Sequence, residues 1–205
     1  MRSSFDQAFE FVVGHEGGYT ADRRDRGNWT SGKIGVGQLK GTKFGVSAMS
    51  YPDLDIKNLT VEDAKAIYLK DYWEKVRSDD LPVGVDYLVF DIAVNHGVRD
   101  AIQWLQLAAG TNPDGVFGPQ TLAAVQRRDP LRLIEEIGVT RQMDYIALKS
   151  WPTYGKGWTR RGYGVVVRAT IMHQATLDQS KVEAPVEELE SRPGLLGGLF
   201  RRRAS

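Results

Sequence analysis

The chain has no cysteine among its 205 residues. Disulfide bonds and thiolate metal sites are therefore excluded. A protein without cysteine folds equally well in a reducing or an oxidising compartment, so this absence leaves the compartment open. At this length one domain, or two small ones, can bury enough apolar surface to fold without cross-links.

Histidine is scarce, and neither sign of charge is in excess. His15, His96 and His173 are scattered and show no H-x-x-x-H spacing, so we expect no metal site.

The formal net charge is only +1, which provides no strong field to attract nucleic acid. We therefore expect no nucleic-acid partner.

Long hydrophobic runs are also missing. Asp6, Glu10 and His15 interrupt the N-terminal segment, which therefore lacks the apolar core of a Sec signal. No apolar run approaches the roughly 20 residues that a membrane-spanning helix needs. The sequence predicts synthesis in a cytoplasm, and action outside it requires an exit route that the sequence does not supply.

Helical patterns dominate what is present. Apolar residues recur at helical spacing in stretches near 5–13, 61–72, 85–93, 102–109, 119–126, 130–149 and 159–179. Ser4 with Gln7 predicts a capping box, and Gly17-Gly18 is expected to end the first helix. Residues 33–39 alternate like a strand. The predicted fold class is therefore mainly α with one small β hairpin.

The composition changes after Ser180. An acidic block and a basic block follow, and the apolar residues between them are Leu195, Leu196, Leu199 and Phe200. We expect 181–205 to form a flexible charged tail outside the core. Apolar residues followed by clustered arginine suit an anionic membrane or lipopolysaccharide surface, so weak contact there is one prediction and a plain solvated end is the other.

Carboxyl groups are the remaining candidates for chemistry, because no nucleophile-elbow, Walker or dinucleotide motif is present. Glu16 lies between an apolar helix face and two glycines, where apolar neighbours raise the pKa of a carboxyl group as a general acid requires. Asp25 follows nine residues later in an arginine-rich loop, which favours its ionised form. Two carboxyl groups in contrasting environments are the working pair of glycoside hydrolysis.

Two alternatives stay open at this point. Asp22 lies in the same loop and competes with Asp25 on the same grounds. A Glu at a helix end and an Asp in a basic loop are also often only solvated or held in local ion pairs, and such residues have no catalytic role.

Five stretches of the chain resemble one family in the same order. They are HEGGY at 15–19, A-x-x-I-Y and D-Y-W within 64–73, L-P and F-D-x-x-V-N-x-G within 81–97, DGVFGPQT at 114–121 and GKGWTRR at 155–161. The set resembles glycoside hydrolase family 108, phage and bacterial N-acetylmuramidases, with the peptidoglycan-binding region that follows it. Each motif is modest alone, but the ordered set is specific.

The resemblance implies a lysozyme-like fold with the hairpin at the active-site cleft. It implies hydrolysis of the β-1,4 bond between N-acetylmuramic acid and N-acetylglucosamine in peptidoglycan, without a cofactor. Glu16 matches the family's catalytic Glu, and Asp25 matches the Asp of its D-x-G-G-x-T stretch. We expect a monomeric, endolysin-type muramidase that is made in the host cytoplasm and acts on periplasmic peptidoglycan after release.

The threonine of that stretch is where this sequence departs from the family. Thr30 and Ser31 stand near the expected offset, but TKFGVS at 42–47 looks more like the family's T-x-[YFW]-G-[IV]-T continuation. We therefore favour Thr42 as the third active-site residue, whose hydroxyl can hold the nucleophilic water. Residues 28–41 are then an insertion that contains the hairpin.

Tyr19 and Asn95 are candidate substrate contacts. The Tyr19 ring can stack on a pyranose face, and Asn95 can bond an N-acetyl group. Each has a structural alternative, Tyr19 as a loop anchor and Asn95 as a helix C-cap. Trp73 and Trp104 are expected to belong to the core.

We expect residues 1–97 to form the muramidase region and 98–180 a peptidoglycan-binding helical region packed into the same compact unit, because no linker divides them. Two other functions compete with hydrolysis. A lytic transglycosylase needs only one catalytic Glu and yields a 1,6-anhydro product. A non-catalytic peptidoglycan-binding or virion module binds the polymer without cleaving it.

Overall fold

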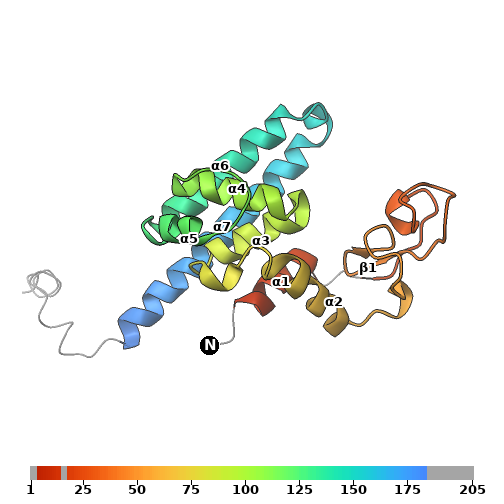
Figure 1. Cartoon of the computed structure of the whole chain (residues 1–205), viewed down its shortest axis with the longest axis horizontal. Coiled ribbons are helices and arrows are strands. Elements are labelled where there is room, and N and C mark those ends of the chain that lie inside the picture. The colour runs from red at the N-terminus through yellow and green to blue at the C-terminus, as the bar shows by residue number, and fades with distance from the viewer. Residues whose placement is uncertain (1–3, 15–17, 184–205) are drawn as a thin grey trace, which may run out of the picture.

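The computed structural model describes residues 4–14 and 18–183. Glu16 and the predicted tail from residue 184 onward lie outside the described residues. Within them, seven α-helices accompany one two-stranded antiparallel sheet (Figure 1). The predicted fold class, mainly α and lysozyme-like with a small hairpin, is confirmed.

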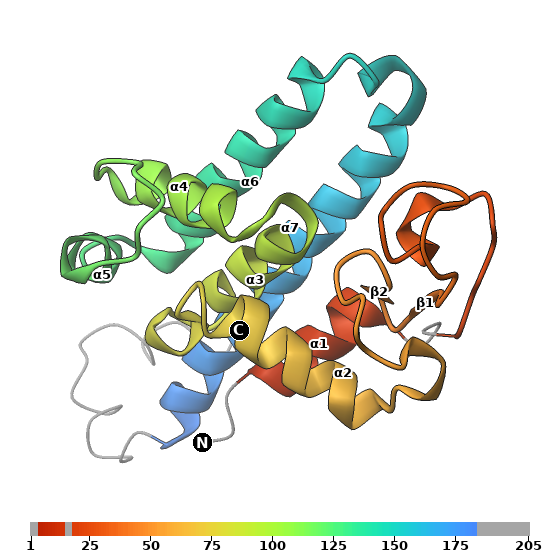
Figure 2. The same ribbon diagram turned by 45° about the vertical axis from the view of Figure 1, so that its right-hand side comes forward.

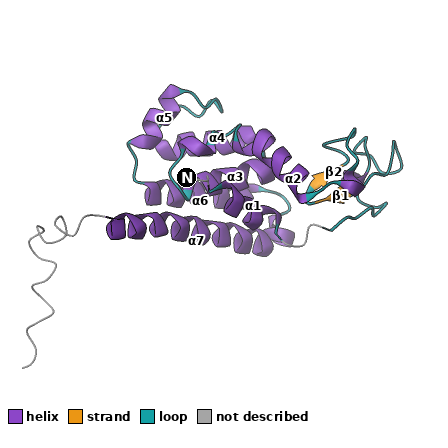
Figure 3. Ribbon diagram, turned by 90° about the horizontal axis from the view of Figure 1, so that it is seen from below, coloured by secondary structure: helices purple, strands orange, loops and turns teal. Residues whose placement is uncertain are grey.

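The helices are α1 (Phe5–Val13), α2 (Val61–Tyr68), α3 (Val85–His96), α4 (Val98–Ala109), α5 (Pro119–Gln126), α6 (Pro130–Ala147) and α7 (Trp151–Glu183). The strands are β1 (Thr42–Lys43) and β2 (Val46–Ser47). Short turns of helix are η1 (Arg26–Asn28), η2 (Ile56–Asn58), η3 (Leu69–Trp73) and η4 (Ser78–Asp80). Figure 3 shows the strands and their long loops gathered at one end of the molecule; we call residues 18–58 the loop lobe.

The central helix of the fold is α3. Every residue from Val85 to Ala93 is buried, so this helix is covered on all sides rather than along one stripe. Helices α1, α4, α6 and α7 pack against it, and Figure 2 shows α3 between α1, α4 and α7. One hydrophobic core includes residues from Phe5 to Met172.

Aromatic rings attach α1 to this core. Phe5 meets Trp73 edge-on at 5.3 Å between ring centroids, and Phe9 meets Tyr68 at 5.4 Å. Such edge-to-face pairs contribute about 0.5–1.5 kcal/mol beyond the area they bury. Trp73 is fully buried and Trp104 nearly so, which confirms that both belong to the core.

Helices α6 and α7 form an antiparallel pair joined by residues 148–150. Gly138 allows their close approach, because a Cβ there would lie 2.7 Å from Cγ2 of Val166. Further along, α7 packs against the start of α3, where a Cβ on Gly84 would lie 2.3 Å from the carbonyl oxygen of Ala169. Although α7 has 33 residues, neither it nor any other described helix has an apolar stretch that would suit a bilayer.

Two predictions about the first helix are wrong. α1 ends at Val13 rather than at Gly17-Gly18, because Gly14 adopts a left-handed φ of 69°. Ser4 precedes the helix but its side chain does not cap it. Its hydroxyl donates instead to the carboxylate of Asp86, a group whose pKa burial raises to about 6.

The hairpin lies at 42–47 and not at the predicted residues 33–39. Gly35 and Gly37 both have a φ of 79°, which interrupts the extended backbone that the alternation suggested. The segment therefore forms an irregular loop, with Trp29 and Leu39 paired as an isolated bridge at its base. The hairpin therefore lies outside residues 28–41, and that these residues are an insertion relative to the family stays a prediction.

One buried carboxylate joins three helices. Asp91 of α3 accepts a bond from Nη1 of Arg141 on α6 at 2.7 Å and from Nη2 of Arg161 on α7 at 3.1 Å. The side chains of Asp91 and Arg141 are each 1% exposed, whereas Arg161 is 46% exposed. A buried ion must stay paired, because leaving its partner without a counter-charge is strongly destabilising.

Replacing each arginine by methionine tests this network. Arg141→Met leaves Asp91 buried with only its half-exposed partner, so the free energy of unfolding should fall by about 3–5 kcal/mol. Arg161→Met keeps the buried pair, so its loss should stay below about 1 kcal/mol. Urea denaturation near neutral pH measures both values. Equal losses in the two variants would contradict the dominance of the buried pair.

Candidate active site

The loop lobe brings Thr42 beside Asn28, a residue that no sequence motif marks. Thr42 Oγ1 donates to Asn28 Oδ1 at 2.7 Å, and Asn28 Nδ2 donates to the carbonyl oxygen of Asp22 at 3.0 Å. Asn28 is completely buried. Because its NH₂ group must face a carbonyl, its amide oxygen faces Thr42 and accepts the hydroxyl proton.

This bond determines what the Thr42 hydroxyl can do. A threonine hydroxyl has one proton and two lone pairs. Since the proton is committed to Asn28, the oxygen can interact with a water only as an acceptor. A water that donates to Thr42 keeps its own lone pairs free, which is the state that a nucleophile needs.

Backbone bonds fix Thr42 relative to the start of the chain. Thr42 and Thr20 exchange both N–H···O bonds of an antiparallel bridge, at 2.8 and 2.9 Å. The carbonyl oxygen of Asn28 accepts from the N–H groups of both Lys40 and Gly41, at 3.0 and 3.1 Å. The hydroxyl therefore stands on a backbone that is bonded on two sides.

Asp25 and Asp22 have different surroundings. Both oxygens of Asp22 accept bonds from Arg24 at 2.8 to 3.2 Å, and this bonding lowers the pKa of Asp22 to about 2. Asp25 is the N-cap of η1, and its Oδ1 accepts from the N–H of Gly27 at 2.8 Å. Within the described part of the chain Asp25 makes no ion pair. Asp25 therefore keeps one carboxylate oxygen available, whereas both carboxylate oxygens of Asp22 are bonded to Arg24.

The hydroxyls of the two alternative residues are used inside the inserted loop. Thr30 Oγ1 accepts from the N–H of Gln38 at 3.0 Å, and Ser31 Oγ donates to the carbonyl oxygen of Val36 at 2.8 Å. Thr30 Oγ1 and Ser31 Oγ both accept backbone N–H bonds inside this loop, whereas Thr42 Oγ1 accepts none from the described residues. Its lone pairs stay open to a water, so Thr42 stays the predicted third active-site residue.

The ring of Tyr19 packs on the backbone of Gly41. Gly41 has a φ of 83°, and a Cβ there would lie 2.6 Å from Cε2 of the ring and 2.3 Å from the carbonyl oxygen of Thr20. Tyr19 is nevertheless 40% exposed. Its ring therefore anchors the loop and still presents surface to solvent, so the predicted sugar contact remains a prediction.

Asn95 is an exposed residue in the last turn of α3. Its Nδ2 donates to the carbonyl oxygen of Asp91 at 2.6 Å. The C-cap of α3 is Gly97, with a φ of 99°, so the alternative that Asn95 caps the helix is wrong. Among the described residues no hydrogen bond links Asn95 to Thr42 or Asp25, and its contact with an N-acetyl group remains a prediction.

Glu16 itself is outside the described residues. Its nearest described neighbours in sequence are Gly14, which follows α1, and Gly18, which leads to the bridge between Thr20 and Thr42. In the described ranges no group of three or more potential ligand side chains could hold a metal ion.

Residues 9–97 match the family described as Glycosyl hydrolase 108, and residues 100–163 match the family described as Predicted Peptidoglycan domain. The solved structure of Brucella abortus SagA is similar, with a TM-score of 0.69 and 33% sequence identity over 84% of this chain and 97% of that chain. No curated protein matches this chain.

The fold and the matched regions define a glycoside hydrolase that acts on peptidoglycan. The chain belongs to the glycosyl hydrolase 108 family. The resemblance to glycoside hydrolase family 108 and its peptidoglycan-binding region, which the ordered motifs indicated, is thereby confirmed.

Three variants test the Thr42 hydroxyl. Thr42→Val leaves the buried Asn28 Oδ1 without a donor, which should cost about 1–3 kcal/mol of stability. Loss of a held water should also lower kcat on purified peptidoglycan by on the order of a hundredfold. Thr42→Ser keeps the hydroxyl and should keep both properties. Thr30→Val is the matched control and should change kcat only a few-fold; if it is the more damaging variant, Thr30 holds the role.

Proposed function

We propose that this protein is an endolysin-type muramidase that hydrolyses the β-1,4 bond between N-acetylmuramic acid and N-acetylglucosamine, with Glu16 as the general acid. The observation that carries the proposal is the Asn28–Thr42 hydrogen bond of 2.7 Å, which orients a hydroxyl beside the segment that follows Glu16. Membership of a glycosyl hydrolase family supports it.

Chain connectivity links Glu16 to that hydroxyl. Thr20 comes four residues after Glu16, and its backbone is bonded to Thr42. Four residues can span at most about 14 Å, so chain connectivity allows the proposal's requirement that the carboxyl group of Glu16 and the hydroxyl of Thr42 share one site. Inverting glycosidases separate their two carboxyl groups by about 6.5–9.5 Å to leave room for a water, and the proposal expects this separation between Glu16 and Asp25.

The proposed reaction is a single displacement. Glu16 donates its proton to the glycosidic oxygen as the bond from that oxygen to the sugar C1 breaks. A water held by Thr42 forms the new bond to C1 from the opposite face. Asp25, which has an oxygen available, stabilises the positive charge that develops on the sugar and takes the proton of the water.

The proposal also covers the setting. The enzyme is made in the host cytoplasm, acts as a monomer and reaches periplasmic peptidoglycan after release. Residues 193–205, outside the described part of the chain, add weak contact with an anionic membrane or lipopolysaccharide surface.

Glu16→Gln is the direct test of the acid. The amide keeps the shape of the side chain but has no proton to transfer, and general acid catalysis contributes typically about 10²–10⁴-fold. Hydrolysis of peptidoglycan should therefore collapse while the thermal midpoint barely moves. Mass spectrometry of wild-type products should show reducing ends. Products with 1,6-anhydro ends would instead make the protein a lytic transglycosylase.

Asp25→Asn and Asp22→Asn form a matched pair in one loop. Asp25→Asn removes the charge that is available to the sugar, so kcat should fall by on the order of 10²-fold or more. Asp22→Asn disturbs an exposed pair with Arg24 and should leave kcat within a few-fold of wild type. Turbidity loss of outer-membrane-stripped cells measures both. The reverse ranking would transfer the role to Asp22.

A further inference from the structure

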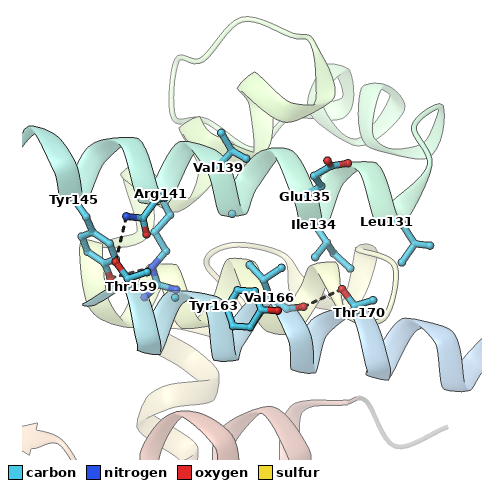
Figure 4. Close-up of a pocket in the computed structure, with 13 residues that line it drawn as sticks. Leu131, Ile134, Glu135, Val139, Arg141, Tyr145, Thr159, Tyr163, Val166 and Thr170 are labelled. Atoms are coloured by element: carbon cyan, nitrogen blue, oxygen red, sulfur yellow. Dashed lines mark hydrogen bonds between the residues drawn. The ribbon is translucent and has the colours of Figure 1, made fainter. Parts of the chain in front are cut away.

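A long hollow lies between α6 and α7, on the helical part of the molecule. It has a volume of about 490 Å³, and Figure 4 shows side chains of both helices pointing into it. Its apolar lining residues include Leu131, Ile134, Val139, Tyr163 and Val166. No residue of the loop lobe lines it, so it is separate from the site around Thr42.

A second hollow continues the first along α7. It has a volume of about 570 Å³, and Thr159 and Tyr163 border both hollows. Its wall is the ring of Trp151, which lies across Gly155 so closely that a Cβ there would be 2.6 Å from the ring. Tyr163 between the hollows is 71% exposed. We call the two hollows together the α6–α7 groove.

The second hollow carries positive charge without a counter-ion. Lys156 and Arg160 line it, and no acidic residue does. In the described part of the chain neither cation forms an ion pair. The one acidic residue of the first hollow, Glu135, is already bound to Arg132 at 2.8 Å.

More positive charge lies beneath the first hollow. Arg141 lines it, and the Nη2 atom of this arginine is buried without a hydrogen-bond partner among the described residues. Arg141 and Arg161 share the single carboxylate of Asp91. Two positive charges against one negative leave this cluster with a net charge of +1.

We propose that the α6–α7 groove binds the stem peptide of peptidoglycan, so that this region of the enzyme holds the peptide part of the substrate while the loop lobe acts on the glycan. Stem peptides combine small apolar side chains with several carboxylates, and the groove combines apolar walls with unpaired cations. A glycan strand matches it less well, because the apolar first hollow offers few partners for sugar hydroxyls. The inference deepens the proposed function by naming the part of the substrate that a second site binds.

Binding is tested with the full-length protein and a soluble stem tetrapeptide released from peptidoglycan by an amidase. The peptide should shift the backbone amide signals of α6 and α7, and added salt should weaken binding because exposed charges are screened. Lys156→Glu with Arg160→Glu turns attraction into repulsion and should weaken binding by about tenfold or more. Lys75→Glu reverses an exposed lysine outside both hollows and should bind as the wild type does.

Activity provides a second, independent measurement. The rate on intact sacculi is divided by the rate on glycan strands from which the stem peptides have been removed. This ratio should fall by about tenfold in the double charge reversal and stay at the wild-type value in Lys75→Glu. If the double variant does not fold, Tyr163→Ala removes an exposed ring from the centre of the groove and should lower the same ratio.

Several outcomes would overturn the inference: no binding of the tetrapeptide, binding that charge reversal does not change, or chito-oligosaccharide shifting the groove signals in its place. A dimer that Tyr163→Ala dissociates would assign the groove to a second copy of the chain and overturn it as well. Failure of the proposed function gives a different result. In that case the products are not those of β-1,4 hydrolysis, but the tetrapeptide still binds and its binding still weakens with salt.

Discussion

The carboxylate of Asp91 lies where α3, α6 and α7 meet, and the arrangement of these helices depends on keeping it paired. Its two arginine partners come from helices that begin far along the chain from α3, so the ion pair forms only when all three helices are in place. The carboxylate belongs to the segment matched by the hydrolase family and the arginines to the segment matched by the peptidoglycan family. A buried charge at that junction penalises any separation of the two segments.

In the loop lobe, a buried polar group that must keep its partners also fixes the structure, but there the groups are neutral. Asn28 begins the stretch that the family resemblance predicts to be an insertion and Thr42 follows it, and a partly buried side-chain bond joins the two. The carbonyl oxygen of Asn28 also accepts from the N–H groups of Lys40 and Gly41. Because both ends of the insertion are bonded to each other, its length has little influence on the position of Thr42, and the entropy of closing a loop grows only slowly with length.

The sequence was sufficient for those features that local pattern determines. Continuous apolar periodicity predicted α3, and ordered motifs predicted the family. Glycines at 155, 157, 162 and 164 weaken a helical pattern, so the sequence predicts a start near residue 159, whereas α7 begins at Trp151 and packing against α6 compensates for the glycines. The hairpin prediction is wrong because apolar alternation does not reveal the left-handed φ of Gly35 and Gly37.

Local sequence patterns do not predict polar pairs between residues that are far apart in the chain. Asn28 is an ordinary loop residue by sequence, and only the fold shows that it is buried between Thr42 and the carbonyl oxygen of Asp22. Arg141 pairs with a residue 50 positions away, so no local spacing marks it. Polar residues of this kind acquire their roles from burial, and burial is decided by how the helices assemble.

Helix α7 connects the α6–α7 groove to the buried carboxylate of Asp91 and to the start of α3. It contributes Thr159 and Tyr163 to the groove, Arg161 to the buried carboxylate, and Ala169 to the contact with the start of α3. A helix cannot bend sharply between these positions without losing backbone hydrogen bonds. Under the proposal, a stem peptide held in the groove would place its own glycan strand at a constrained distance from the groove. Binding at two linked points raises the effective concentration of the second point only when their separation matches, so the proposed groove would favour glycan bonds at a fitting distance from an attached peptide.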